Sequence, residues 1–138
     1  MWLYNGEEFT SEMIEDYVGF VYLITDKSND KKYVGKKLLT SKRKLPPLKG
    51  KTRRRTVVKE TDWQKYYGSS EEVQLMVEEK GADNFHREIL TLCKSKGELG
   101  YLEAKYQFEH DVLLRDDYYN GIIQCKIHRN HVKSLKNS

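Results

Sequence analysis

Residues 18–25 read VGFVYLIT, residues 32–36 read KYVGK, and the segment between them, DKSND at 26–30, is made of turn-forming residues. The first run is rich in β-branched and aromatic residues, which is typical of a mostly buried strand. The second run resumes an extended pattern after the turn. The stretch therefore predicts a β-hairpin that carries Tyr22 on one strand and Tyr33 on the other, with ten residues between them.

The segment from Lys36 to Lys59 follows directly, and its charge separates it from the rest of the chain. It carries eleven Lys or Arg and no Asp or Glu, so the remaining residues hold fourteen basic against twenty-one acidic side chains, a balance of −7 within a net charge of +4. Pro46 and Pro47 interrupt regular structure, which predicts a long basic loop at about 36–60 with a short helix before the prolines.

Charge concentrated in this way indicates contact with the phosphates of a nucleic acid. The side chains expected to bind nucleic acid are Lys36, Lys37, Arg53, Arg54 and Arg55. A run of charge can also be an ordinary solvated surface loop. The absence of any acidic residue from the segment favours the phosphate interpretation.

Two capping boxes mark the helices expected in the second half of the chain. Ser69–Glu72 opens a helix that Gly81 ends, and Ser95–Glu98 opens a longer helix expected to run to about Leu114. A strand is expected between them at about 85–92.

The order of elements is strand, strand, helix, strand, helix, and a last short strand is also expected at about 122–127. This order predicts an α+β fold in which helices pack on a small three-stranded antiparallel sheet. The length of 138 residues fits one domain, 1–138, that ends in a polar, basic tail at about 128–138.

Glu103 falls on the apolar stripe of the longer helix. At about 100° per residue it lies near Leu99 and Tyr106, so its carboxylate points toward the apolar side. Burial of a carboxylate costs free energy unless the group is paired with a cation or binds a metal. Glu103 is therefore a candidate metal ligand, and a buried ion pair is the alternative.

Composition excludes some classes of protein. No apolar run approaches the roughly 18 to 20 residues that span a bilayer, and the acidic N-terminal segment lacks the apolar core of a signal peptide. Cys93 and Cys125 are the two cysteines, and they are expected to be reduced in a cytoplasmic protein with no membrane partner.

Taken together, Val21-Tyr22, Tyr33-Val34-Gly35, a later helical glutamate and an asparagine after a tyrosine resemble the GIY-YIG nuclease superfamily, over roughly residues 18–123. Phe20 stands where that pattern has glycine, and Gly19 is adjacent. A second set of residues is similar to small phage-borne homing endonucleases of the superfamily: Asp62 to Ser70, Gly81, Phe85 and Glu88-Ile89-Leu90.

The resemblance implies a metal-dependent endonuclease that cuts double-stranded DNA with Mg²⁺ or Mn²⁺. It implies that Glu103 holds the metal, that Tyr22 helps to deprotonate a water, and that Tyr33 lies nearby. It also implies that Asn120 organises the site and that an arginine contacts the phosphate. Arg43 has the family's spacing after Gly35, although Pro47 stands where a histidine is common.

Several alternatives remain open from the sequence. Arg53 to Arg55, Lys36 or Lys37 could supply the phosphate-binding cation in place of Arg43. The biological role could be homing, restriction or repair, or the chain could be a DNA-binding module that has lost catalysis. One site per chain implies either a homodimer or two sequential nicks for a double-strand cut, and a phage-encoded protein would work in the cytoplasm of a bacterial host.

Overall fold

The predicted hairpin is the centre of the fold. In the computed structural model, which describes residues 1–135, β3 (Gly19–Asp26) and β4 (Lys31–Leu38) pair antiparallel along their whole length. Tyr22 lies opposite Gly35 in this register, and Ile24 lies opposite Tyr33. Asp26 closes the turn because its Oδ1 accepts hydrogen bonds from Ser28 N at 3.0 Å and Ser28 Oγ at 2.7 Å.

The sheet is larger than the sequence predicted. Within residues 1–135 it has five strands in the order β2-β1-β7-β3-β4, and β1 runs parallel to β7. The additional strands are β1 (Trp2–Tyr4) and β2 (Glu7–Glu8), while β7 (Phe85–Cys93) is the strand expected at 85–92. The expectation of a purely antiparallel three-stranded sheet was wrong because strands of two and three residues are too short to show alternation.

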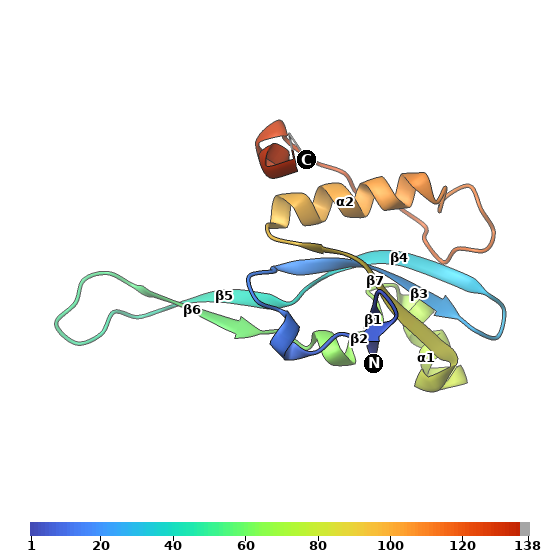
Figure 1. Ribbon diagram of the computed structural model, residues 1–138, viewed down its shortest axis with the longest axis horizontal. Coiled ribbons are helices and arrows are strands. Elements are labelled where there is room, and N and C mark those ends of the chain that lie inside the picture. The colour runs from blue at the N-terminus through green and yellow to red at the C-terminus, as the bar shows by residue number, and fades with distance from the viewer. Residues whose placement is uncertain (136–138) are drawn as a thin grey trace.

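The two faces of the sheet carry different cores. Val21 and Val34 point to one face, where they pack against Leu99 of α2 (Lys96–Glu109). On the opposite face the core consists mainly of aromatic side chains, led by Trp2, Phe20, Tyr22 and Trp63. Figure 1 shows α2 on one side of the sheet and α1 (Glu71–Lys80) on the other.

A helix begins at each predicted place, although the cap of the first is Ser70 and not Ser69. Ser70 caps α1 by accepting a hydrogen bond from Val73 N, and Ser95 caps α2 by accepting one from Glu98 N at 3.1 Å. Short 3₁₀ segments connect the other elements at Ser11–Met13, Trp63–Lys65, Ala82–Asn84 and Arg129–Leu135.

The second helix ends at Glu109 and not near Leu114 as expected. Asp111 adopts a left-handed conformation with φ 52°, and Val112 N donates back to Gln107 O at 3.2 Å. This is the Schellman arrangement, which usually has glycine at the left-handed position. Because aspartate occupies that position in place of glycine, the sequence gives no clear signal for the end of the helix.

The predicted basic loop is largely a second hairpin. β5 (Thr40–Leu45) pairs antiparallel with β6 (Arg55–Glu60), and residues 46–54 connect them. The helix expected before the prolines does not form, because residues 40–45 pair with the strand Arg55–Glu60, which follows the prolines. We call residues 40–60 the basic ribbon, and Figure 1 shows that it projects away from the sheet and helices.

The strand expected at 122–127 is also absent from the described part of the chain. One isolated bridge joins Lys32 to Tyr118. Further along β4, the side chains of Asn120 and Gln107 form hydrogen bonds with the backbone of Val34. The C-terminal tail forms the 3₁₀ segment Arg129–Leu135 against α2, where Gly97 makes room for His131. Residues 136–138 of the predicted tail lie outside the described residues. No helix within 1–135 is long and apolar enough to cross a membrane.

Candidate active site

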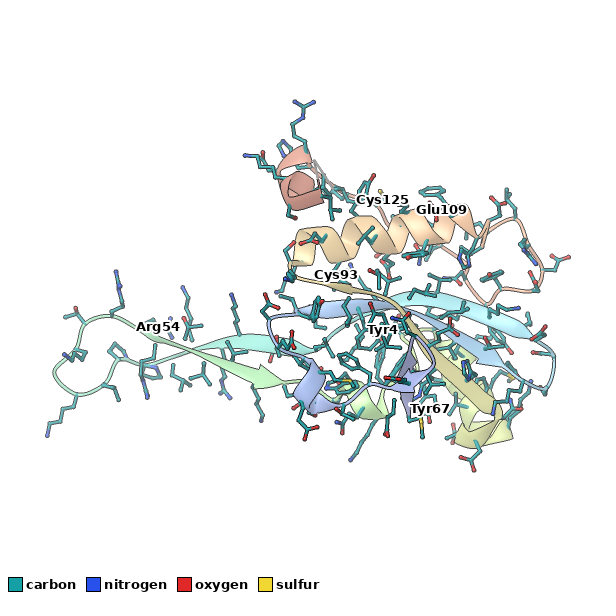
Figure 2. All side chains as sticks on the ribbon, viewed as in Figure 1. Tyr4, Arg54, Tyr67, Cys93, Glu109 and Cys125 are labelled. Atoms are coloured by element: carbon teal, nitrogen blue, oxygen red, sulfur yellow. The ribbon has the colours of Figure 1, made fainter. Side chains whose placement is uncertain are left out.

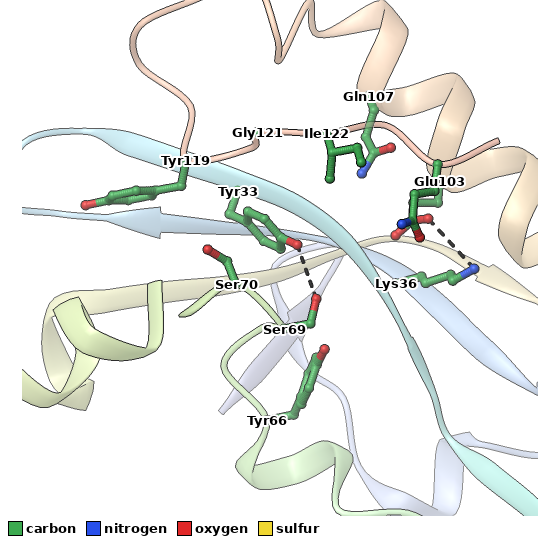
Figure 3. A pocket seen from close by; sticks show the side chains of 11 residues that line it. Tyr33, Lys36, Tyr66, Ser69, Ser70, Glu103, Gln107, Tyr119, Gly121 and Ile122 are labelled. Atoms are coloured by element: carbon green, nitrogen blue, oxygen red, sulfur yellow. Dashed lines mark hydrogen bonds and ion pairs between the residues drawn. The ribbon is translucent and has the colours of Figure 1, made fainter. Parts of the chain in front are cut away.

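A cleft of about 550 Å³ opens along the edge of β4. Because β4 is the edge strand, side chains from both faces of the sheet reach this cleft: Tyr33 approaches from the aromatic face and Glu103 from the α2 face. Its lining residues are Tyr33, Lys36, Tyr66, Ser69, Ser70, Glu103, Gln107, Tyr119, Gly121, Ile122 and Gln124. Figure 3 shows the hydroxyls of Tyr33, Ser69 and Tyr66 on one side of the cleft and Glu103 with Lys36 on the other.

Glu103 and Lys36 form the charged part of the cleft. Lys36 Nζ lies 3.8 Å from Glu103 Oε1, and the side chains are 49% and 15% exposed respectively. Burial raises the pKa of the Glu103 carboxyl, and the positive charge of Lys36 opposes that shift. The helical stripe therefore does bring this carboxylate to a half-buried position, where a lysine faces it.

Tyr33 stands between the charged pair and the segment before α1. Its hydroxyl lies 3.2 Å from Ser69 Oγ, which fixes the ring at the cleft wall. Burial raises the pKa of Tyr33, and the hydrogen bond with Ser69 acts in the opposite direction. The hydroxyl is therefore neutral near pH 7 and can donate or accept a hydrogen bond.

Tyr22 is fully buried directly beneath the cleft. Its ring centroid lies 6.2 Å from that of Tyr33 and 5.9 Å from that of Tyr66, both of which line the cleft. The Tyr22 hydroxyl makes no hydrogen bond to any described residue. Burial, and then the neighbouring Tyr66, raise the pKa of Tyr22 well above its ordinary value.

Gly35 leaves the room that the Tyr22 hydroxyl occupies. A Cβ at Gly35 would overlap that hydroxyl and approach Tyr22 Cζ to 2.6 Å, so no other residue fits opposite Tyr22. A Cβ at Gly68 would lie 3.6 Å from the same hydroxyl, which is an ordinary contact, so glycine is favoured there by its φ of +98°. Sterics thus explain the triplet Tyr33-Val34-Gly35. Gly35 makes room for Tyr22, and Tyr33 on the same strand lines the cleft.

A buried arginine that the sequence did not single out holds the wall of the cleft. Arg87 is 4% exposed on β7, and its guanidinium donates to Gln64 O at 3.0 Å and Tyr66 O at 2.8 Å. The guanidinium also stacks over the rings of Trp2 and Tyr67. The signal was present in the alternation of Phe85, Arg87 and Ile89, which places an arginine on an inward-facing strand position.

Asn120 bonds the exposed edge of β4 in place of another strand. Its side chain accepts from Val34 N at 3.0 Å and donates to Val34 O at 2.8 Å. Gln107 Nε2 donates to the same carbonyl at 3.0 Å, whereas the buried Gln107 Oε1 has no hydrogen-bond partner among the described residues. Asn120 therefore fixes Val34, the residue between Tyr33 and Gly35. The sequence analysis did not identify Gln107, which lies one helical turn after Glu103, as a residue of the site.

The predicted basic residues are divided between two places. Lys36 lines the cleft, and Lys37 pairs with Asp62 at 2.7 Å and covers the ring of Tyr66. The predicted arginines all lie in the basic ribbon: Arg43 is exposed on β5, and Arg53, Arg54 and Arg55 are exposed where the connecting loop meets β6, as Figure 2 shows for Arg54. Within residues 1–135 no arginine lines the cleft.

The donors at the cleft decide which metal ion it could hold. The described part of the chain contains no group of three or more His, Cys, Asp or Glu side chains that could enclose an ion. The cleft offers one carboxylate, Glu103, and the unpartnered amide oxygen of Gln107. This set fits a hydrated Mg²⁺ or Mn²⁺ shared with a phosphate, because such ions keep several waters and need only one or two protein oxygens.

Comparison with known proteins gives one match, to a family of endonucleases. The family model described as "Putative endonuclease segE, GIY-YIG domain" matches residues 2–123, a range that contains Tyr22, Tyr33 and Glu103. No curated protein and no solved structure matches the chain. Since the match covers most of the chain, including both strands of the tyrosine hairpin and α2, the protein belongs to the SegE-type GIY-YIG endonuclease family.

Proposed function

We propose that this protein is a metal-dependent DNA endonuclease that hydrolyses phosphodiester bonds in the cleft at the edge of β4. One observation carries the proposal: a half-buried carboxylate, Glu103, faces Lys36 across a cleft whose wall is the tyrosine of the predicted motif. Phosphodiester hydrolysis needs a metal-binding carboxylate, a cation beside the phosphate and hydroxyls that orient water. These groups come from segments that are distant in the chain.

Glu103 and Lys36 take complementary roles in this proposal. Glu103 holds the divalent ion, and Lys36, already 3.8 Å from that carboxylate, moves its charge to the scissile phosphate. When bound, the ion lowers the pKa of the attacking water and stabilises negative charge on the phosphate. The water oxygen then bonds to phosphorus and its proton passes to bulk water, while the bond to one ester oxygen breaks and the leaving oxygen takes up a proton from bulk water.

Tyr22 and Tyr33 orient the water in this proposal and do not act as pre-formed bases. Because burial keeps both hydroxyls protonated at neutral pH, each provides a hydrogen bond and not a phenolate. The Tyr22 hydroxyl has unused hydrogen-bonding capacity beneath the cleft, and Asn120 keeps β4 in the register that places Tyr33 above it.

Double-stranded DNA is the proposed substrate, contacted by Lys36 and Lys37 beside the cleft and by Arg53, Arg54 and Arg55 in the basic ribbon. The family match supports a DNA substrate, and the similarity to phage-borne relatives favours homing over restriction or repair. With one cleft per chain, a double-strand cut requires a homodimer or two sequential nicks. Mapping cuts on random and on defined-site DNA separates homing from the other roles.

A second candidate function is DNA binding without catalysis. The observation that favours it is that no arginine lines the cleft within the described residues, and Arg43, the arginine with the family's spacing, is exposed on β5. In this case the basic ribbon would bind DNA while the cleft remains inactive. Arg43 as the catalytic cation stays a prediction, because substrate could draw the ribbon toward the cleft.

The deciding experiment is a supercoiled-plasmid nicking assay in Mg²⁺ and Mn²⁺, comparing wild type with Glu103→Ala and Glu109→Ala. Glu109 lies on the same helix, pairs with Lys105 on the surface and does not line the cleft. We expect Glu103→Ala to lower the nicking rate at least about 10²- to 10³-fold, because it removes a group that stabilises transition-state charge. Glu109→Ala should nick at the wild-type rate.

Circular dichroism and DNA binding in EDTA serve as controls for folding and substrate affinity. The endonuclease proposal fails if wild type does not nick in either metal, and the binding-only function is then favoured. It also fails if Glu103→Ala and Glu109→Ala nick equally well.

A further inference from the structure

The basic ribbon is a two-stranded element with no described neighbour covering either face. All residues of β6 are exposed, and four of the six residues of β5 are exposed. Figure 1 shows the ribbon projecting from the body as an extension of β4, and Figure 2 shows its side chains directed into solvent on both sides. An isolated two-stranded hairpin is marginally stable in water, so its exposure calls for a partner.

The charge of the ribbon defines the kind of partner. Residues 41–59 contain nine Lys or Arg and no Asp or Glu. None of the nine forms an ion pair within residues 1–135. A second copy of the ribbon would bring like charges together, so edge-to-edge pairing between copies is disfavoured. A polyanion is the complementary partner.

The base of the ribbon is fixed to the body. Thr61 N donates to Leu39 O at 2.9 Å, and Thr61 Oγ1 donates to Leu38 O at 2.6 Å. Glu60 Oε1 accepts hydrogen bonds from Ser11 Oγ at 2.7 Å and Trp63 Nε1 at 2.6 Å. The ribbon is thus attached at a defined place beside β4 and does not hang from a flexible linker.

The register sorts the cations onto two faces. Residues directly opposite each other in an antiparallel pair share a face, and successive residues alternate. Arg43 lies opposite Val57 and Arg55 lies opposite Leu45, so these four side chains lie on one face. Lys42 lies opposite Val58 and Lys44 opposite Thr56, so the lysines of β5 lie on the other face.

We propose that the basic ribbon enters the major groove of duplex DNA and reads sequence there with its arginine face. This inference rests on the proposed DNA endonuclease function. The major groove of B-DNA, about 12 Å wide, admits a two-stranded ribbon, whereas the major groove of duplex RNA is too narrow. Arginine forms bidentate hydrogen bonds with guanine and apolar side chains contact thymine methyl groups, so Arg43, Arg55, Leu45 and Val57 suit base edges. Lys42 and Lys44 contact the phosphates.

The attachment predicts where the recognised bases lie. The chain runs from Lys36 in the cleft to Leu45 near the tip of β5, nine residues on. At about 3.3 Å per residue this spans at most roughly 30 Å, which corresponds to about nine base pairs. The recognised bases should therefore lie on one side of the cut and within about nine base pairs of it.

The first test excises the ribbon from the full chain. Residues 42–58 are replaced by Asn-Gly, a two-residue turn that joins the opposite residues Ser41 and Lys59 and leaves Glu60 and Thr61 in place. Binding to a random-sequence 30-base-pair DNA pool is measured in EDTA by fluorescence anisotropy between 50 and 200 mM salt. We expect the slope of log affinity against log salt to fall in magnitude by about 4, or about 10²-fold in affinity across this range, if about half of the cations contact phosphate.

The second test uses two variants that each remove two positive charges from exposed positions. Arg43→Ala/Arg55→Ala removes the arginine face, and Lys42→Ala/Lys44→Ala removes the lysines of the opposite face. The lysine variant should lower the magnitude of the salt slope by up to about 2, because each lysine contacts a phosphate, whereas the arginine variant should change the slope less. Selection of bound duplexes from the random pool should return a sequence preference for wild type and for the lysine variant, but not for the arginine variant.

The outcomes separate this inference from the endonuclease proposal. The groove inference is overturned if the excised protein keeps the wild-type salt slope, or if the two double variants select the same sequences. It is also overturned if duplex RNA competes as well as duplex DNA. Absence of plasmid nicking by wild type would reject the endonuclease function alone, because the binding measurements require no cleavage.

Discussion

Two adjacent stretches of the same chain, β4 in the body and β5 in the basic ribbon, have opposite environments. Val34 on β4 is fully buried, and its neighbour Gly35 packs against Tyr22. On the ribbon, Val57 and Val58 are 40% and 58% exposed although they also lie in a regular strand. Both stretches are β-structure, so strand formation alone does not say where a core is.

The difference lies in what each stretch pairs with. β4 pairs with β3, which is itself covered on both faces, by α2 and by the aromatic core. β5 pairs with β6, and no described element covers either face of that pair. Packing therefore stabilises the body, whereas the side chains of the ribbon are largely exposed to solvent.

The largest expected effect is at Asp26, a fully buried carboxylate in the body. It accepts hydrogen bonds from Lys80 Nζ at 2.6 Å, Asn84 Nδ2 at 2.7 Å and Tyr119 Oη at 2.8 Å. Asp26→Ala should lower the free energy of unfolding by at least about 3 kcal/mol, because it removes several hydrogen bonds to a charged group and leaves the buried Tyr119 hydroxyl without its acceptor. Urea unfolding at pH 7 measures this, with the exposed Asp116→Ala as control.

The same carboxylate predicts a pH dependence. Burial favours the neutral form of Asp26, but hydrogen bonds from Lys80, Ser28 and Asn84 outweigh it and hold the pKa well below the ordinary value. A lowered folded-state pKa gives stability that is present above the unfolded pKa of about 3.9 and is lost as pH falls. Asp26→Asn should therefore reduce the loss of stability between about pH 5 and 3. An unchanged profile would contradict the assignment.

A smaller effect separates the same substitution in the two regions. Val34→Ala should cost about 2 kcal/mol of unfolding free energy, because it removes fully buried apolar groups. Val58→Ala, on the ribbon, should change it by less than about 0.5 kcal/mol. Thermal and urea unfolding of both variants provide the measurement. Equal losses would mean that Val58 is covered in solution and that the ribbon is packed as the body is.

The smallest stability effect is expected for Tyr22→Phe, the change closest to the cleft. The Tyr22 hydroxyl is buried without a described hydrogen-bond partner, so its removal should leave stability within about 0.5 kcal/mol or increase it. Plasmid nicking should nevertheless fall by about 10²-fold if the hydroxyl orients water. A stable variant that nicks at the wild-type rate would show that Tyr22 contributes only to core packing and that its hydroxyl has no role in cleavage.

The tyrosine hairpin, both capped helix starts and the burial of Glu103 could be predicted because each depends on neighbouring residues and on local periodicity. The short strands β1 and β2 could not, because three residues show no period and Trp2 finds its place only beside Arg87 on β7. The basic ribbon was missed because Pro46, Pro47 and Gly50 indicate a loop, and they do occur in one, between two strands.

The motif tyrosines, the carboxylate on a helical stripe and the concentration of positive charge can all be recognised in the sequence. That Tyr33, Lys36 and Glu103 meet at one cleft, and that the predicted arginines lie outside it on a ribbon, follows from the three-dimensional arrangement of the strands and helices. The physical reason is that local patterns fix which face of a strand or helix a residue occupies. Which elements then face one another depends on long-range pairing, here the placement of β4 at the sheet edge, where both faces reach the same cleft.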